Sequence, residues 1–569
     1  MKTHIDLKFI FYMIIILLFF YQKGIASNIL GGEITWECHT SGKYIFKMKV
    51  YTNCDTNSGA PQYRYANRIL RINGSSLPTD SFNQAIQTIS LKPDSIAIVS
   101  QQAVEVPNCS GVPSYSCSNG EIGPIQVFYY VSDPIYMKGS PPLGGWQFVY
   151  GDFCCRANTE NLQIGRQQVL TSTMYPDTTS LSVYPCVNNS PRFIAPVSQI
   201  HCRGLVNTVS YTALDEENDS LDYQFSMSFN SPLNSPIAAN YQSGYSYNNP
   251  TPDYFFNSFN QPATLDYTSG LMHFKIQNGV GQGVKAYHVA VRVDAYSNGI
   301  LNASVIREYP IYLLDCPTLT NGGANTPPQV FGANVLGSAI NLTDTVTVGN
   351  LLTSSFSISD SNQNNQQAQG LTFEVFSDEI TLDYSMNAAC LKVGDTSCAS
   401  ISSSISPVYD TTLKRYVFKN NGSINGTLNW RPSCADLGPN NSARKHYFIL
   451  KAQDDHCPVP AVQYEVLEIT VLPDPNNPCG TITSIIDGEP LNERISIFPN
   501  PTNGLVNVKL TQKEQLEVSI RNLQGKLVNQ FIIKNKSNFR FQIDGPAGIY
   551  FLELSNREGE SVNKKIVTL

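Results

Sequence analysis

Short runs in which polar and apolar side chains alternate recur along this chain, and they constrain its fold more than any other feature. The run from Lys43 to Tyr51 is typical, because its alternation fits a strand with one buried face. No long stretch shows the periodicity of an amphipathic helix. The chain is therefore predicted to be all-β, with tandem β-sandwich domains and a small β-sandwich at the C-terminus. Further β-prone runs lie at 125–131, 286–294, 306–314, 372–376, 446–452 and 464–472.

The composition fits an exported β-protein and argues against a nucleic-acid partner. Only 15% of the 569 residues are charged, and the chain holds 30 tyrosines and 27 phenylalanines. The net charge of −7 leaves no basic surplus to meet a phosphate backbone. At ~150 residues per domain, the length predicts roughly three to five domains.

Residues 1–26 have the pattern of a secretory signal peptide. Lys2 and Lys8 supply positive charge, and an unbroken apolar run follows from Phe9 to Tyr21. Small residues at Gly24 and Ala26 fit a cleavage site that follows them. The apolar run is shorter than the ~20 residues that a membrane helix needs, so no transmembrane segment is expected in the mature chain.

The fourteen cysteines are expected to form disulfides, because an exported chain meets an oxidising environment. No CxxC pair has the spacing of zinc ligands. Cys38 and Cys54 flank one short strand pair, whereas Cys202 and Cys316 lie near the two ends of one candidate domain. The cysteines suspected of forming disulfides are Cys38, Cys54, Cys109, Cys117, Cys202, Cys316, Cys390, Cys398, Cys434 and Cys457; spacing assigns no partner to Cys154, Cys155, Cys186 or Cys479.

Changes in composition along the chain predict the domain boundaries. Two stretches rich in Asn and Pro, the first also rich in Gly, are expected to be linkers. The two units that precede and follow the first linker share the order of several short segments, which suggests diverged copies of one plan. The predicted organisation is a signal peptide (1–26), a Cys-rich N-terminal β region of one or two domains (27–190), a β-sandwich (191–317), a linker (318–328), a second β-sandwich (329–473), a linker (474–490) and a terminal domain (491–569).

Four segments follow one another at the end of the chain: IFPNPTNG (497–504), VSIRNLQGKLV (518–528), PAGIYFLEL (546–554) and KKIVTL (564–569). Together they closely resemble the type A sorting domain of the type IX secretion system. The resemblance implies a small β-sandwich that the outer-membrane translocon reads and its processing machinery removes. The rest of the chain would then be attached to the cell surface or released. The motif residues are Pro499, Asn500, Pro501, Gly504, Gly525, Gly548, Tyr550 and Lys565.

The N-terminal segment also resembles known surface proteins. LGGEITWEC (30–38) and KVYTNC (49–54) look like the opening of large surface proteins of Bacteroidota, which often carry gliding-motility or adhesin labels. The segments 153–158 and 452–458 fit the same group. This resemblance implies an extracellular location more than a particular activity.

An acidic run in the first predicted sandwich is a candidate calcium site. Asp215, Glu217 and Asp219 alternate before a predicted strand, which resembles the calcium-binding loops of cadherin-like and related immunoglobulin-like repeats. Calcium takes six to eight oxygen ligands, and alternate residues of an extended loop can turn carboxylates to one side. The competing interpretation is an acidic turn without a metal. In the second sandwich Asp360 and Asn362 replace the acids, and an insertion breaks their spacing.

The sequence contains no familiar catalytic motif. There is no GxSxG, HExxH or P-loop pattern. A Cys–His pair at His456 and Cys457 is not expected to be catalytic, because a disulfide-bonded cysteine is no nucleophile.

The expected role is binding rather than catalysis. Trp36, Trp146 and Trp430 are expected in cores, whereas the Tyr-, Ser- and Asn-rich stretch from about Ser231 to Asn257 is a plausible contact surface. We expect a secreted or surface-attached protein that adheres to an unidentified extracellular ligand: a glycan, a matrix or another cell. The alternatives are a secreted glycan or peptide hydrolase with an unrecognised site and a passive surface-layer component.

Overall fold

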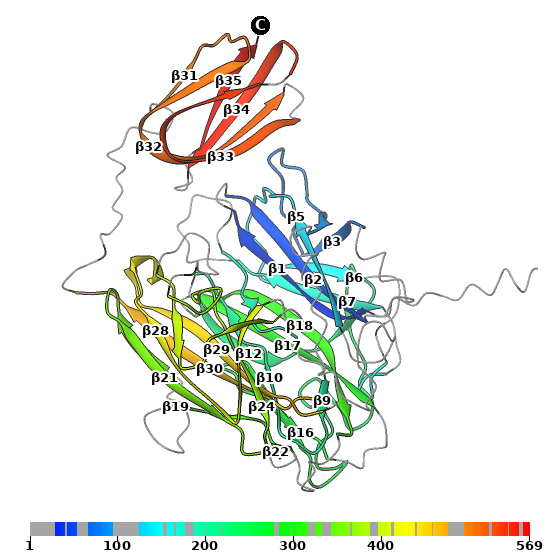
Figure 1. Cartoon of the computed structure of the whole chain (residues 1–569). Coiled ribbons are helices and arrows are strands. Elements are labelled where there is room, and N and C mark those ends of the chain that lie inside the picture. The colour runs from blue at the N-terminus through cyan, green and yellow to red at the C-terminus, as the bar shows by residue number, and fades with distance from the viewer. Residues whose placement is uncertain are drawn as a thin grey trace, which may run out of the picture. The chain divides into compact units, whose positions relative to one another are not determined.

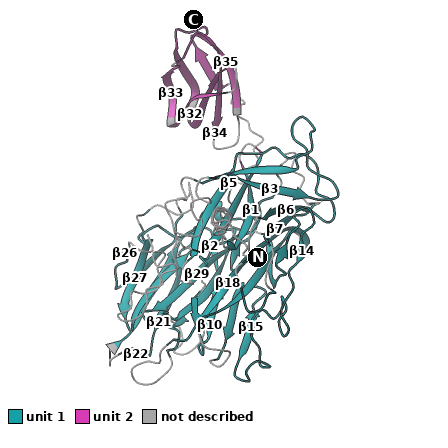
Figure 2. Cartoon of the chain, turned by 90° about the vertical axis from the view of Figure 1, so that its right-hand side faces the viewer, with its two compact units in different colours: residues 1–38, 43–475 teal, residues 39–42, 476–569 magenta. Residues whose placement is uncertain are grey.

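The computed structural model confirms the all-β prediction (Figure 1). Within the residues it describes, the named elements are strands and one short 3-10 turn, Cys434–Asp436. None of the helices in that part of the chain is long and apolar enough to cross a membrane. The main compact unit ends at Pro475, and the C-terminal strands belong to a second unit (Figure 2). The structure describes residues 29–39, 42–53, 66–94, 125–151, 156, 158–163, 167–176, 186, 188–197, 200–217, 219–277, 284–297, 299–316, 325–332, 343–364, 367–386, 388, 397–410, 415–438, 441–457, 459–475, 479, 494–522, 526–543, 545–556 and 561–568.

The N-terminal strands form a closed ring that is completed by β18, a strand from much later in the chain. Hydrogen bonding runs in the order β18-β1-β2-β5-β4-β3-β6-β7, and β7 pairs again with β18. Strands β7 and β1 pair with successive parts of the same edge of β18. Ala303–Val305 pair with β7, and Glu308 pairs with Gly32 of β1. The strands are β1 (Ile29–Cys38), β2 (Tyr44–Asn53), β3 (Arg68–Asn73), β4 (Thr88–Pro93), β5 (Ile125–Ser132), β6 (Trp146–Gly151), β7 (Gln168–Met174) and β18 (Ile300–Leu314).

Strand alternation places opposite faces of the same strands in two cores. Trp36 and Phe46 face the core inside the ring, whereas Leu30 and Tyr51 of the same strands face a second core. The three-stranded sheet β10-β16-β15 contributes Met272 to this second core. The remaining strands of this region are β8 (Arg192–Phe193), β9 (Ile200–Cys202), β10 (Asn207–Ser210), β11 (Ala213–Leu214), β12 (Ser220–Phe225), β13 (Phe229–Asn230), β14 (Ile237–Ala238), β15 (Gln261–Leu265), β16 (Leu271–Lys275) and β17 (Lys285–Ser297).

The boundary predicted at residue 190 falls within one hydrogen-bonded sheet. Strands from both sides of it belong to one 13-stranded sheet, which Figure 1 shows as blue and cyan strands beside the green β17 and β18. Buried charges reinforce the join: Glu33 of β1 pairs with Arg307 of β18 and with Lys49 of β2 (2.7 Å). Alternation identifies strands but does not reveal which distant strands pair, so the sequence pattern missed this join.

Residues 329–472 form a β-sandwich with its own two main sheets. The four-stranded sheet β19-β21-β28-β25 faces the six-stranded sheet β20-β30-β29-β24-β27-β26, and Phe356 and Phe373 pack between them with ring centroids 4.9 Å apart. Ile449 and Tyr464 pack against Leu271 of the preceding sandwich. The strands are β19 (Gln329–Gly332), β20 (Thr343–Thr347), β21 (Leu352–Ser359), β22 (Gln363–Asn364), β23 (Gln367–Ala368), β24 (Gly370–Phe376), β25 (Ser400–Ser403), β26 (Val408–Asp410), β27 (Arg415–Asn421), β28 (Ser423–Trp430), β29 (Arg444–Asp454) and β30 (Val462–Leu472).

The C-terminal unit is built around one long strand, β32, which pairs with β31, β33 and β34. The first part of β32 pairs with β31 and its second part with β34, while β33 follows both parts. The β32–β33 register shifts between Lys509 and Leu516, and side chains from both parts of β32 share one core. The strands are β31 (Ile495–Phe498), β32 (Leu505–Asn522), β33 (Leu527–Gln542), β34 (Gly548–Asn556) and β35 (Ser561–Thr568).

Two disulfides can be described with both of their cysteines, Cys202–Cys316 and Cys38–Cys186. The second does not link Cys38 to a cysteine near it in the sequence. Cys202 bonds to Cys316, which joins the two ends of the predicted domain. Cys38 bonds to Cys186 rather than to a cysteine beside its own strand pair. Cys398, Cys434, Cys457 and Cys479 are also disulfide-bonded; Cys54, Cys109, Cys117, Cys154, Cys155 and Cys390 lie outside the described residues.

Candidate functional site

The predicted sorting motif forms a loop that is held against the last strand of the chain. Asn500 Nδ2 donates to the Lys565 carbonyl (2.7 Å), and Asn500 Oδ1 accepts from the Val567 amide (2.8 Å). The Thr502 amide donates to the Val567 carbonyl (2.8 Å). Because β35 lies at the edge of its sheet, the loop covers polar backbone groups that would otherwise face solvent.

Other motif residues have conformational or packing roles in the same unit. Gly504 has φ +99°, and a Cβ there would lie 2.5 Å from the side-chain nitrogen of Gln542. Tyr550 is buried, and its hydroxyl donates to the Pro546 carbonyl (2.9 Å). Gly525 lies outside the described residues.

The remaining motif residues frame this loop. Pro499 and Pro501 flank Asn500, and Gly548 opens β34, where its amide donates to the Thr568 hydroxyl (2.9 Å). Residues 496–568 match the family model of the secretion system C-terminal sorting domain. The chain carries a type IX secretion sorting domain. This domain directs secretion to the cell surface or the extracellular space, and it implies interaction with the type IX machinery.

Comparisons of the whole chain give no further identification. No curated protein matches it. Similar solved structures include titin domains A168–A170 (8% identity, TM-score 0.14), with 67% of this chain and 99% of that chain covered. Another is dimeric latent PorU from Porphyromonas gingivalis (12% identity, TM-score 0.12), with 67% and 32% covered. These TM-scores are too low to carry an argument about fold or function.

The predicted calcium residues lie at one end of the second core, among three asparagines that sequence reasoning missed. Asp215 directly follows β11, and its Oδ1 accepts from the amides of Glu217 (3.1 Å) and Asp219 (3.0 Å). The side chains of Asn188, Asn189 and Asn302 donate to carboxylates of the same run. Asn188 and Asn189 precede β8, and Asn302 lies on β18. All three are far from the acidic run in the sequence, so residue spacing could not indicate them.

Several oxygen atoms of this cluster are buried without a hydrogen-bond donor. They are Oδ2 of Asp215, Oε2 of Glu217 and the amide oxygens of Asn188 and Asn302. Burial, together with the charge of Asp219, raises the pKa of Asp215 to about 7. Burial, together with the charge of Asp215, raises the pKa of Glu217 to about 8. The ionised form of Asp215 or Glu217 is therefore costly here. Each acid is either held protonated or needs a cation beside it.

The carboxylates alone do not make a metal centre. In the described part of the chain, no group of three or more His, Cys, Asp or Glu side chains is arranged to hold a metal ion. The donor set still suits a hard cation such as calcium, because carboxylate and amide oxygens are its preferred ligands. Asp215, Glu217, Asn188 and Asn302 would complete such a site with their unpaired oxygens.

An exposed group of aromatic side chains lies at the end of the Tyr-, Ser- and Asn-rich stretch. We call residues 253–260 the aromatic loop. Tyr254 is 60% exposed, Phe255 81% and Phe259 72%, and the rings of Tyr254 and Phe255 lie 4.3 Å apart between centroids. The predicted contact surface ended at Asn257, so it missed Phe259.

Hydrogen bonds at its base hold the aromatic loop in place. Asp253 is buried; its Oδ1 accepts from the Phe255 amide (2.9 Å) and its Oδ2 from Asn249 Nδ2 (3.0 Å). Phe256 stacks on Tyr245 with ring centroids 4.8 Å apart. The loop thus presents its exposed rings from a preorganised backbone, which lowers the entropy cost of binding.

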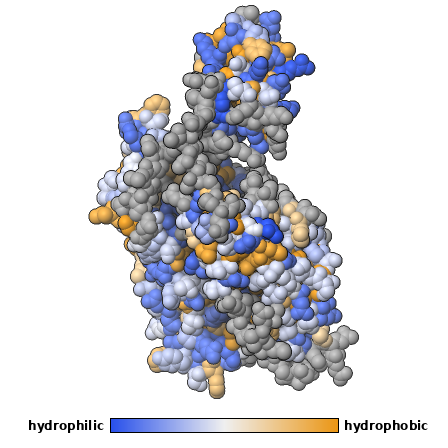
Figure 3. Space-filling model, turned by 90° about the vertical axis from the view of Figure 1, so that its left-hand side faces the viewer, coloured by the Kyte–Doolittle hydropathy of each residue, from blue (hydrophilic) through white to orange (hydrophobic). Residues whose placement is uncertain are grey.

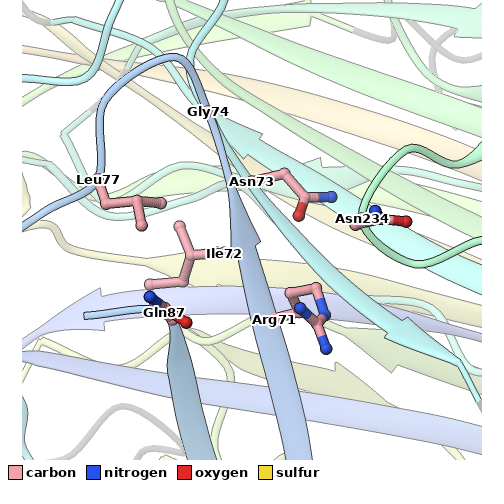
Figure 4. Close-up of a pocket in the computed structure, with 7 residues that line it drawn as sticks. All are labelled: Arg71, Ile72, Asn73, Gly74, Leu77, Gln87 and Asn234. Atoms are coloured by element: carbon pink, nitrogen blue, oxygen red, sulfur yellow. The ribbon is translucent and has the colours of Figure 1, made fainter. Parts of the chain in front are cut away.

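A separate pocket of about 250 Å³ lies beside β3. Arg71 and Asn73 extend to one side of the strand, with Asn234 nearby, while Leu77 lies on the other side (Figure 4). Figure 3 shows one face of the molecule, on which patches of hydrophobic residues lie among hydrophilic ones.

The structure also places the residues considered for catalysis. Cys457 is disulfide-bonded, so its thiol is not a nucleophile in this state. The His456 amide donates to the Asp454 carboxylate (3.0 Å). As expected, Trp36, Trp146 and Trp430 are buried, each at most 2% exposed.

Proposed function

We propose that this protein is a non-catalytic binding protein of the cell surface or extracellular space, and that the aromatic loop makes its contact with neutral glycans. The observation that carries the proposal is the exposure of Tyr254, Phe255 and Phe259 on a backbone anchored by hydrogen bonds. Sugar rings offer apolar C–H faces that stack on aromatic planes, and such planes give contact area at a low entropy cost.

The charge pattern favours a neutral ligand. From Ser231 to Asn260, Asp253 is the sole Asp, Glu, Lys, Arg or His residue. Both of its carboxylate oxygens accept hydrogen bonds within the protein. An ionic partner would gain little from such a surface, whereas hydroxyl-rich neutral sugars can use the neighbouring Asn and Ser side chains.

A glycan array probed with the purified chain tests this function. We expect binding to neutral glycans without turnover, and at least a ~10-fold loss of affinity in Tyr254→Ala/Phe255→Ala, because both stacking planes are removed. Phe82→Ala is the matched control, since Phe82 is as exposed as Phe255 at 81% and lies between β3 and β4.

Two outcomes would contradict the proposal. One is equal loss of binding in the Phe82 control, which would indicate non-specific adhesion through any exposed ring. The other is release of shorter sugars during incubation, which would reveal a hydrolase.

Calcium at the Asp215 cluster is part of the same proposal, as a stabilising ion at one end of the second core. The unpaired oxygens of Asp215 and Glu217 support it. Chelation is expected to lower the melting temperature of the chain, and Asp215→Asn is expected to reduce that effect. An unchanged melting temperature on chelation would remove calcium from the proposal.

A further inference from the structure

A second cluster of buried oxygen atoms lies in the sandwich of residues 329–472, where the insertion after Asp360 makes a metal less expected from the sequence. Asp360 directly follows β21, Asp454 ends β29, and Asn325 precedes β19. Their side chains are 8%, 2% and 2% exposed. Asp454 is far from Asp360 in sequence, which is why spacing within one acidic run could not reveal the pair.

The cluster occupies the same place in its sandwich as the Asp215 cluster does in the preceding one. In both, an Asn-x-x-Pro segment leads directly into a strand, at Asn188–Pro191 and at Asn325–Pro328. That strand pairs antiparallel with a second strand, β8 with β11 and β19 with β21. The residue after the second strand is Asp215 in one case and Asp360 in the other.

Backbone donors hold the two carboxylates by one oxygen each. Asp454 Oδ1 accepts from the amides of His456 (3.0 Å) and Ala461 (2.8 Å). Asp360 Oδ1 accepts from the Asn362 amide (2.7 Å). These bonds fix the carboxylates and leave their second oxygens to face other groups.

The remaining polar atoms of the cluster are incompletely paired. Asn325 Nδ2 contacts Asp454 Oδ2 (2.5 Å), but Asn325 Oδ1, Asp360 Oδ2 and both side-chain polar atoms of Gln369 are buried with no partner. The backbone of Gln369 adjoins that of Asp360, because the Gly422 amide donates to the Gln369 backbone carbonyl (2.9 Å) and the Asp360 amide donates to the Gly422 carbonyl (3.0 Å). Buried polar atoms without partners are rare in folded proteins and point to a missing ligand.

The pKa values of Asp360 and Asp454 are both raised, as they are for the acids of the Asp215 cluster. Burial, with a smaller contribution from the charge of Asp360, raises the pKa of Asp454 to about 7. Burial and the charge of Asp455 raise the pKa of Asp360. Two buried, mutually repelling acids need either a shared proton or a cation, and a hard divalent cation would satisfy carboxylate and amide oxygens together.

We propose that Asp360 and Asp454, with the side-chain oxygens of Asn325 and Gln369, bind a divalent cation of the calcium class. The ion joins the segment that precedes β19 to the ends of β21 and β29. This inference is independent of the glycan-binding proposal.

Calcium titration by calorimetry, with thermal melting in calcium and in EDTA, tests the site on the full chain. Asp360→Asn and Asn325→Ala are each expected to weaken calcium binding by ~10-fold or more at one site and to reduce the calcium-dependent rise in melting temperature. Asp133→Asn, at an exposed ion pair with Lys92, is the matched control and should leave both readouts unchanged. Asp215→Asn distinguishes the two clusters, because its loss should add to that of Asp360→Asn.

The outcomes separate an ion from a proton. If folded Asp360→Asn and Asn325→Ala bind calcium as the unaltered chain does, the proposed site is wrong. If the melting temperature depends on pH but not on calcium, the acids are held protonated and the proposal is also overturned. Asp454→Asn provides a third variant whose result must agree with the other two.

Discussion

The side chain of Asn500 joins the motif loop to the last strand of the sorting domain. Asn500→Ala removes both of its hydrogen bonds to β35, which should lower the free energy of unfolding of the C-terminal unit by about 1–2 kcal/mol. The measurement is amide exchange at Val567, which should become faster. Asn507→Ala is the control, because it removes a single, longer bond to the Phe498 carbonyl (3.3 Å). Equal exchange rates in both variants would refute the role of Asn500.

The buried acids of the Asp215 cluster should make the stability of the fold fall as pH rises, whereas ordinary salt-bridged acids make it rise. An unfolded carboxyl has a pKa of about 4, whereas the pKa is about 7 for Asp215 and about 8 for Glu217 in the folded chain. The folded state therefore holds the protons more tightly, and this stabilisation is lost as pH rises through that range. In EDTA, the melting temperature should fall between about pH 5 and pH 8. Calcium should remove most of that fall; a melting temperature in EDTA that rises over the same range would contradict this account.

At the scale of elements, local alternation predicted strands well. The run at Lys43–Tyr51 became β2, the runs at 125–131 and 306–314 lie within β5 and β18, and those at 446–452 and 464–472 lie within β29 and β30. Pairing between distant strands could not be predicted in this way, because the alternation of β1 does not specify β18 as its neighbour. The partner of Cys38 was missed for the same reason, since Cys186 is distant in sequence.

The close approach of β1 and β18 gives a test of their join. A Cβ at Gly31 would lie 1.7 Å from the Glu308 carbonyl oxygen, so Gly31→Ala must push the two strands apart. We expect the free energy of unfolding of the main unit to fall by about 3 kcal/mol, measured by denaturant unfolding. Gly144→Ala has open space around its Cβ and should change stability by less than about 1 kcal/mol. A neutral Gly31→Ala would mean that β18 does not close the ring.

At the scale of the whole molecule, the sequence predicted the secretion route more fully than the candidate contact surface. The sorting motif is continuous in the sequence, so the residues around Asn500 and Gly504 identify the domain without any knowledge of its three-dimensional structure. The candidate contact surface was located only roughly, because the exposure of Phe255 and Phe259 depends on the hydrogen bonds beneath the loop. The sequence could single out Asp360 but not Asp454 as its neighbour, since the two acids meet only where the ends of β21 and β29 come together.

The secretion route can be measured directly in a host with an intact type IX translocon. The fraction of the chain outside the cell is compared between the full chain and a chain ending at Pro475, the end of the main unit. We predict that the full chain reaches the cell exterior, whereas the shortened chain stays in the periplasm in folded form. Export of the shortened chain at the level of the full chain would contradict the sorting role of the C-terminal domain.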